Sequence, residues 1–153
     1  MIVKNCMKRR VISILETDSI REAAKKIVEH HIGTLPVLNQ DGLLVGTIRI
    51  HDLLLLQMPS FFSLISDLDF IDDYGAVEAS SPPMDQLDRP VSELKRPAVA
   101  VEEDSGLLAA YGLLLQHQLT DIPVVSEEGK LVGIVSHVDI GATILATWNQ
   151  IGA

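Results

Sequence analysis

The chain has 153 residues, of which 47% are hydrophobic and 22% charged, so it can bury a core without disulfide or metal cross-links. Its net charge of −9 opposes the electrostatic attraction on which nucleic-acid binding depends, and its single cysteine excludes an internal disulfide. No apolar run approaches the length of a membrane span. We expect a cytoplasmic, soluble protein with no nucleic-acid partner and no membrane insertion.

The sequence contains an internal repeat. A shift of 87 residues aligns residues 35–52 with residues 122–139, and seven of these eighteen positions are identical, against about one expected by chance. Upstream, residues 7–9 align with residues 94–96 at the same shift, and Asp18 and Ser19 align with Asp104 and Ser105 after a one-residue slip. The predicted organisation is a first repeat over 1–58, an insert over 59–90 and a second repeat over 91–153.

Each repeat predicts the element order β-α-β-β-α, an α/β (α+β) fold. Residues 11–15 predict a first strand, and Ser19 with Glu22 has the capping-box spacing that opens an amphipathic helix. A hairpin follows, with strands over 35–38 and through Gly46 joined by a turn that ends in Gly42. The last helix opens near Asp52.

The second repeat predicts the same elements over residues 98–101, 106–117 and 122–125, with a last helix near Asp139. Its first helix, residues 106–117, is apolar on almost every side, and we expect it to be buried on more than one face. The proline in second place of each short strand, 35–38 and 122–125, predicts a strand end or a strand at the edge of a sheet.

The insert is acidic and contains four of the six aromatic residues of the chain. Its carboxylates lack the spacing of a calcium-binding loop, so they predict a solvated linker and no metal site. Phe61, Phe62, Phe70 and Tyr74 predict that the insert packs against a partner subunit or over a cleft.

The repeated pattern resembles the CBS (cystathionine-β-synthase) domain. The features that carry it are a Pro-Val strand, a turn glycine, a Leu-Val-Gly triplet and an Asp that opens the last helix, each present twice. The resemblance implies a Bateman-type regulatory module, in which two repeats pack through their sheets with pseudo-twofold symmetry. It also implies two clefts between the repeats, where members of this family commonly bind AMP, ADP, ATP or S-adenosylmethionine.

The nucleotide signature of that family is Gly-h-x-Ser/Thr-x-x-Asp, where h is apolar, and residues 133–139 match it fully. Asp139 can accept hydrogen bonds from both ribose hydroxyls and Ser136 can donate to a phosphate; the alternative is that Asp139 acts as a helix cap alone. The first copy, residues 46–52, keeps Asp52 but has Arg49 in place of the hydroxyl residue. Arg49 either fills the first cleft or supplies a positive charge to a phosphate.

The resemblance also implies that backbone groups beside each Pro-Val strand contact the adenine. The matching residues are Thr34, Leu35, Pro36, Thr120, Asp121, Ile122 and Pro123. His51 and His137 flank the signatures and are candidates for phosphate contact. The basic residues ahead of each first strand either meet a phosphate or are solvated linker charges: Lys8, Arg9, Arg10, Lys95 and Arg96.

No catalytic constellation is recognisable, because the neighbouring Ser136 and His137 lack the arrangement of an activated nucleophile, and no required cofactor is expected. We therefore expect an adenine-nucleotide-sensing regulatory module that passes its signal to a separate enzyme or transporter. The alternative is a ligand-free scaffold for dimerisation or interaction. Residues 53–56 and the last helix supply more apolar surface than one module needs, which predicts a homodimer.

Overall fold

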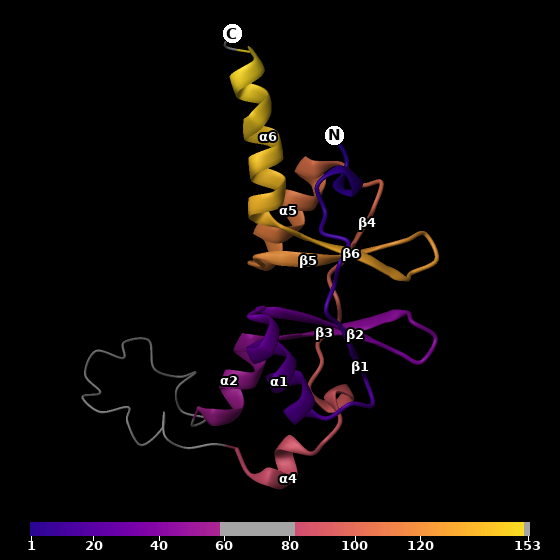
Figure 1. Ribbon diagram of the computed structural model, residues 1–153, viewed down its shortest axis with the longest axis vertical. Coiled ribbons are helices and arrows are strands. Elements are labelled where there is room, and N and C mark those ends of the chain that lie inside the picture. Colours follow the sequence, from indigo (N-terminus) through magenta and orange to yellow (C-terminus); the bar gives the residue numbers. More distant parts are fainter. Residues whose placement is uncertain (59–81, 152–153) are drawn as a thin grey trace, which may run out of the picture.

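The computed structural model describes residues 1–58 and 82–151, with side chains as far as residue 148 (Figure 1). The first half contains β1 (Ile14–Leu15), α1 (Ile20–His30), β2 (Thr34–Leu38), β3 (Leu44–Arg49) and α2 (Ile50–Gln57). The second half contains β4 (Val101–Glu102), α5 (Leu107–His117), β5 (Asp121–Val125), β6 (Leu131–Ser136) and α6 (His137–Ile151). The predicted order β-α-β-β-α is confirmed in both halves. The aromatic part of the insert lies outside the described residues, so its packing stays a prediction.

Helix α1 begins where the capping box predicts. The Ser19 hydroxyl accepts a hydrogen bond of 3.1 Å from the backbone of Glu22, which satisfies one of the free amide groups at the helix start. The helix ends at His30, and its C-cap, His31, has a left-handed φ of 51°. The equivalent cap of α5 is Gly106, which has no side chain to accept such a bond.

Each half has a three-stranded sheet in which the second strand is central. In the first half β2 pairs in parallel with β1 and antiparallel with β3. Pro36 therefore lies in a central strand, and the prediction of an edge strand is wrong; β5 holds Pro123 in the same way. The proline is tolerated because its nitrogen faces the β1 side, where β1 begins only opposite the next residue, Val37.

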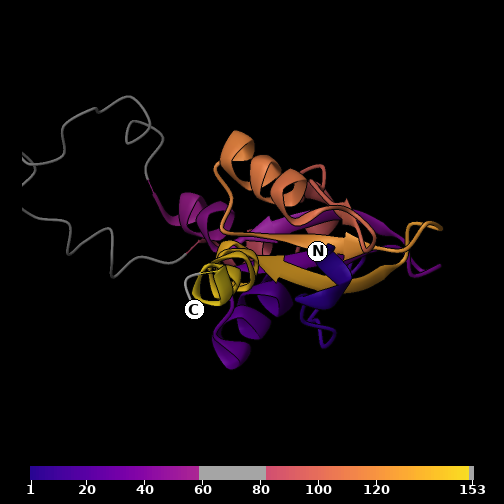
Figure 2. The same cartoon turned by 90° about the horizontal axis from the view of Figure 1, so that it is seen from above.

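The two sheets face each other, with the helices on the outer sides (Figures 1 and 2). Two contacts join residues that are 87 positions apart and thus equivalent in the repeats. The Thr34 hydroxyl donates to the Asp121 carboxylate at one end, and Leu43 bridges Lys130 at the hairpin end. A contact between equivalent residues must lie on the axis that relates them, so the pseudo-twofold axis passes through this junction.

A short segment ahead of each half crosses to the sheet of the other half. Lys8 exchanges two backbone hydrogen bonds of 2.9 Å with Ile134 of β6, and Arg96 exchanges two of 3.0 Å with Thr47 of β3. Val3, in the 3-10 helix η1 (Val3–Asn5), is buried in the core of the second half. Figure 1 shows this N-terminal segment, in indigo, beside the second half. Each half of the structure therefore packs with the segment that precedes the other half in the sequence, so the two halves do not coincide with the two sequence repeats.

The crossing segments also correct the alignment of the repeats. The 3-10 helix η3 (Val91–Glu93) follows η1 by 88 positions, whereas α5 follows α1 by 87. Lys8 is thus equivalent to Arg96, and Ser19 to Gly106, so both upstream alignments predicted from the sequence are wrong by one residue. The linker between the crossing segment and the first strand is one residue longer in the first copy, and short similarities such as Lys-Arg and Asp-Ser concealed this.

The glycine of each Leu-Val-Gly triplet lies against a crossing segment. A Cβ atom at Gly46 would lie 2.7 Å from the carbonyl oxygen of Arg96, and one at Gly133 would lie 2.9 Å from that of Lys8. Neither carbonyl can move without breaking the bridge described above. The glycines are therefore required for the segments to cross.

We predict that Gly46→Ala lowers the free energy of unfolding by about 2 kcal/mol, since overpacking against backbone displaces the crossing segment. Urea unfolding followed by circular dichroism measures this effect. Gly112→Ala is the matched control, because a Cβ there meets nothing within 4 Å and the helix gains about 0.5–1 kcal/mol. Equal effects of the two substitutions would contradict the crossing.

Helix α5 is not buried on several faces, so that prediction is wrong for the residues described. Leu107, Ala110 and Leu114 enter the core, but Leu108 is 75% exposed and Leu115 is also exposed. Their side of the helix points away from the sheet, and no other part of the described chain covers it. Of the helices described, none is both long and apolar enough to cross a bilayer.

Candidate nucleotide site

Two clefts open at the junction of the halves, and each takes residues from both. The first cleft, of about 260 Å³, is lined by Thr34, Thr47, Arg49, Arg96, Pro97, Val99, His117, Leu119 and Pro123. The second cleft, of about 290 Å³, is lined by Lys8, Arg10, Val11, Ile12, His31, Ile32, Gly33, Thr34, Asp121 and Ile134. Each combines the signature strand of one half with the helix end and first-strand linker of the other. The pseudo-twofold axis exchanges the two clefts.

The second cleft has apolar walls and a basic rim. Ile134 lies in the signature strand β6, while Val11, Ile12 and Ile32 come from the first half. Lys8 and Arg10 supply the positive charge. Apolar walls with a few polar groups at one side are typical of sites for small organic ligands.

Asp139 lies at the start of α6, outside the lining of this cleft, and is linked to it through Lys8. Its Oδ2 accepts a hydrogen bond of 3.0 Å from the backbone of Ser136, and the Ser136 hydroxyl accepts one of 3.0 Å from the backbone of Asp139. This reciprocal pair caps the helix. The other carboxylate oxygen, Oδ1, has a loose ion pair of 3.8 Å with the exposed Lys8, and the side chain is 18% exposed. Asp139 is therefore a cap that keeps one oxygen for a further donor.

Asp52, the equivalent acid, is in a different state. Its side chain is only 2% exposed, and its Oδ1 pairs with Nε of Arg96 at 2.5 Å. Its Oδ2 accepts a hydrogen bond of 2.9 Å from the backbone of Arg49 and lies 3.9 Å from Nε of the same residue. Both oxygens are thus engaged within the chain. The two signature acids of this chain differ in what they can still bind.

Thr34 and Asp121 lie where the two clefts meet. Thr34 lines both clefts, and its hydroxyl donates a hydrogen bond of 2.5 Å to the Asp121 carboxylate, which lines the second. Of the neighbouring candidates, Pro123 lines the first cleft. Pro36 is fully buried, while Leu35 and Ile122 are 0% exposed and belong to the two cores. The alternation of side chains along a strand turns Leu35 and Ile122 away from the clefts, whereas Pro36 shares its face of β2 with Thr34.

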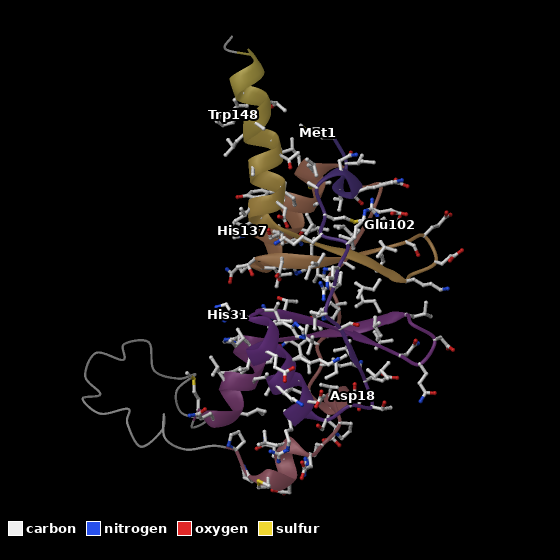
Figure 3. All side chains as sticks on the ribbon, viewed as in Figure 1. Met1, Asp18, His31, Glu102, His137 and Trp148 are labelled. Carbon is white, nitrogen blue, oxygen red and sulfur yellow. The ribbon has the colours of Figure 1, made fainter. Side chains whose placement is uncertain are left out.

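The two histidines of the signatures lie outside both linings. Nδ1 of His137 is 3.1 Å from the carbonyl oxygen of Thr120, and the ring borders a hollow with Tyr111 and Leu115 on the outer surface. Figure 3 shows His137 at the base of α6 and His31 at the edge of the facing half. His51 is exposed and lines neither cleft. Neither signature histidine therefore reaches a cleft, whereas His31 lines the second cleft.

Several cleft residues were not predicted from the sequence. They are Val11, Ile12, His31, Ile32 and Gly33 in the second cleft, and Thr47, Pro97, Val99, His117 and Leu119 in the first. The signal that identifies them is the twofold relation itself. Because it sets each signature opposite the other half, the linker and helix end of one repeat belong with the signature of the other.

Cys6 lies beneath the second signature, packed against the core of the second half. Burial raises the pKa of the Cys6 thiol, a hydrogen bond with Thr143 lowers it, and the nearby charge of Asp139 raises it. The raised pKa reduces the thiolate fraction at neutral pH and with it the reactivity of the thiol. Among the residues described, no group of three or more His, Cys, Asp or Glu side chains is placed to hold a metal ion.

Comparison with known proteins identifies the family to which the chain belongs. CBSX2 from Arabidopsis thaliana has the same fold, with a TM-score of 0.74 and 24% identity over 97% of this chain and 96% of that one. The structure of CBSX2 in complex with AMP gives a TM-score of 0.72 and 26% identity, over 95% of this chain and 97% of that one.

Among curated relatives, the CBS domain-containing protein CBSX1, chloroplastic, of Arabidopsis thaliana is 31% identical over 125 residues, which cover 78% of this chain and 53% of that protein. MJ1426 of Methanocaldococcus jannaschii, uncharacterized, is 27% identical over 92% of this chain and 89% of its own. The chain spans little more than half, 53% and 57%, of the first two curated relatives that it matches. The model of the CBS domain matches residues 3–58 and 91–144, so the chain belongs to the CBS domain family and carries the domain twice.

Proposed function

We propose that this chain is a regulatory module that senses an adenine nucleotide in its second cleft and passes the signal to a separate enzyme or transporter in the cytoplasm. The observation that carries the proposal is the open oxygen of Asp139 at the N-terminus of α6, which lies 3.8 Å from Nζ of Lys8, a residue that lines the second cleft together with apolar side chains. A similar protein, CBSX2, has been solved with AMP, which supports the same ligand class for this chain.

The proposed pose follows from the chemistry of the cleft. The adenine ring lies between the apolar side chains of Val11, Ile32 and Ile134, where its flat faces are removed from water. The ribose hydroxyls donate to Oδ1 of Asp139. Lys8 swings from its loose ion pair toward the phosphate, which also approaches Arg10 and the start of α6. In this pose the adenine ring contacts apolar side chains, the ribose contacts a carboxylate and the phosphate contacts positive charge.

Calorimetric titration with AMP, ADP, ATP and S-adenosylmethionine tests the proposal. We expect at least one of them to bind, and adenosine to bind more weakly than AMP because it lacks the phosphate that Lys8 and Arg10 meet. No binding by any of the four would favour the alternative, a ligand-free scaffold. One observation favours that alternative: in the first cleft both carboxylate oxygens of Asp52 already bind Arg96 and the backbone of Arg49, so neither is available to a ligand.

We also propose that the module is a homodimer, which rests on two uncovered apolar surfaces. One lies on α5 and α6, where Leu108, Val138 and Trp148 are exposed, and the other lies on α1 and α2, with Val28 and Leu54. Figure 3 shows Trp148 on the outer part of α6, pointing away from the rest of the molecule. Surfaces of this kind on a soluble monomer are unusual, and a closed twofold pair covers them most simply.

We predict that light scattering at micromolar concentration gives twice the chain mass of 16.7 kDa. Leu108→Asp places a charge in the centre of the α5–α6 surface and is expected to shift the protein toward the monomer. Leu15→Asp is the control, because Leu15 is also exposed but lies on β1, outside the four helices that carry the two surfaces. A monomer mass for the parent chain would refute the dimer.

A further inference from the structure

We infer that the first cleft binds a phosphate group through Arg49 and Arg96 and does so without a ribose contact. The proposed nucleotide site is the second cleft, so the two proposals rest on different residues and can fail separately. The ligand is a compact phosphate anion, either free or as the phosphate chain of a nucleotide whose sugar is not recognised.

The first step is the loss of the ribose acceptor. A nucleoside held as proposed for the second cleft needs a carboxylate oxygen with a weak partner, as Asp139 has. Asp52 offers none, because Arg96 and the backbone of Arg49 take both oxygens and the side chain is almost fully buried. A ribose would have to displace a charge-assisted hydrogen bond to a buried carboxylate, which is stronger than the bonds it could make itself.

The second step is the free capacity of the two guanidinium groups. Within the described chain, both reach Asp52 through Nε, which leaves their terminal nitrogens without a described partner. Arg49 is 28% exposed and Arg96 is 52% exposed, and both line the cleft. Two cations against one carboxylate leave a net positive charge in a chain of net charge −9. Arginine nitrogens fixed in this way match the oxygens of a phosphate.

The third step is the polar floor of the cleft. Thr47 stands in the first cleft where Ile134 stands in the second, and Arg49 stands where the second signature has Ser136. Thr47 is nearly buried, and its hydroxyl can donate to a phosphate oxygen. The rim adds the His117 ring, whereas the Thr34 hydroxyl already donates to Asp121. The apolar side chain of Ile134 in the second cleft therefore suits an adenine ring, whereas the hydroxyl of Thr47 in the first cleft suits a phosphate oxygen.

The test uses pyrophosphate and the full chain carrying Asp139→Ala, which removes the ribose acceptor of the second cleft. In a phosphate-free buffer of low salt, calorimetry is expected to show that pyrophosphate binds this variant and that adenosine does not compete. ATP and 2′,3′-dideoxy-ATP are expected to bind it with equal affinity. The two arms separate free phosphate from nucleotide phosphate, since pyrophosphate alone has no nucleoside.

Adding Arg49→Gln is expected to weaken pyrophosphate binding about tenfold, and Thr47→Val about threefold, as expected for one charged and one neutral hydrogen bond. Thr47→Val keeps the shape of the side chain, so it still tests pyrophosphate binding in the first cleft if Arg49→Gln fails to fold. Lys25→Gln is the charge control, because Lys25 lies on the exposed face of α1 and outside the cleft. Absence of pyrophosphate binding, equal loss in Lys25→Gln, or displacement by adenosine would overturn the inference. The AMP titration of the parent chain stays informative in each of these cases.

Discussion

Replacement of Arg96 by alanine is expected to lower the free energy of unfolding by about 3 kcal/mol. The loss arises because Asp52 is almost completely buried, and removal of its guanidinium partner leaves a charged carboxylate away from water. Arg49 compensates only in part, because its Nε forms a longer ion pair of 3.9 Å with the other carboxylate oxygen. Urea unfolding of the parent and the variant, followed by circular dichroism, measures the difference.

Two further variants separate this effect from loss of the crossing segment. Lys8→Ala removes the equivalent basic residue of the other half, whose ion pair is loose and exposed, and is expected to cost less than about 0.5 kcal/mol. Asp52→Asn removes the buried charge but keeps an acceptor for the backbone of Arg49, so the double variant with Arg96→Ala should be less destabilised than the sum of its parts. Strict additivity would show that Arg96 acts through its backbone and packing alone.

Substitution of Asp139 by alanine is expected to weaken the binding of AMP about 10- to 100-fold. Hydrogen bonds from the ribose to a charged group in a partly enclosed cleft are worth about 1.5–3 kcal/mol, and alanine removes both. Isothermal titration of the folded variant gives the affinity directly. Unchanged affinity would move the nucleotide out of the second cleft.

The same substitution also removes a helix cap, which costs about 1 kcal/mol of stability. Ser19→Ala is the matched control, because Ser19 caps α1 through one hydrogen bond to Glu22 and lines neither cleft. It should lower the melting temperature to a similar degree and leave AMP binding unchanged. If Ser19→Ala weakened AMP binding as strongly as Asp139→Ala, the loss would reflect stability and not contact with the ligand.

The elements of this fold are predictable because their signals are local. The capping box at Ser19 and the turn at Gly42, where φ is 80°, depend on residues within one turn of chain. The repeat then supplies each element a second time, so a weak signal such as the bare cap at Gly106 is supported by its equivalent. The family follows from the same repeated spacing.

What the sequence could not predict depends on contacts between distant segments. The crossing of residues 1–8 to β6 leaves no pattern in either segment, and the alignment was wrong by one residue where it begins. The state of Asp52 is equally hidden, because its partner Arg96 is 44 positions away and belongs to the other repeat. Leu35 and Ile122 were assigned to the site for their backbone groups, and that assignment stays a prediction, while their side chains lie in the cores. Exposed Leu108 was read as buried because a pattern cannot tell a core from an uncovered surface.

The exchange of the crossing segments has a consequence for synthesis on the ribosome. Residues 1–8 emerge long before the edge of β6 with which they pair, since that edge is made only when the chain has reached Ser136. The first half, in turn, has its own edge at Thr47 uncovered until Arg96 has left the exit tunnel. Neither half can therefore complete its sheet as an isolated nascent domain: the first needs Arg96, and the second must recapture a segment that was made more than a hundred residues before β6.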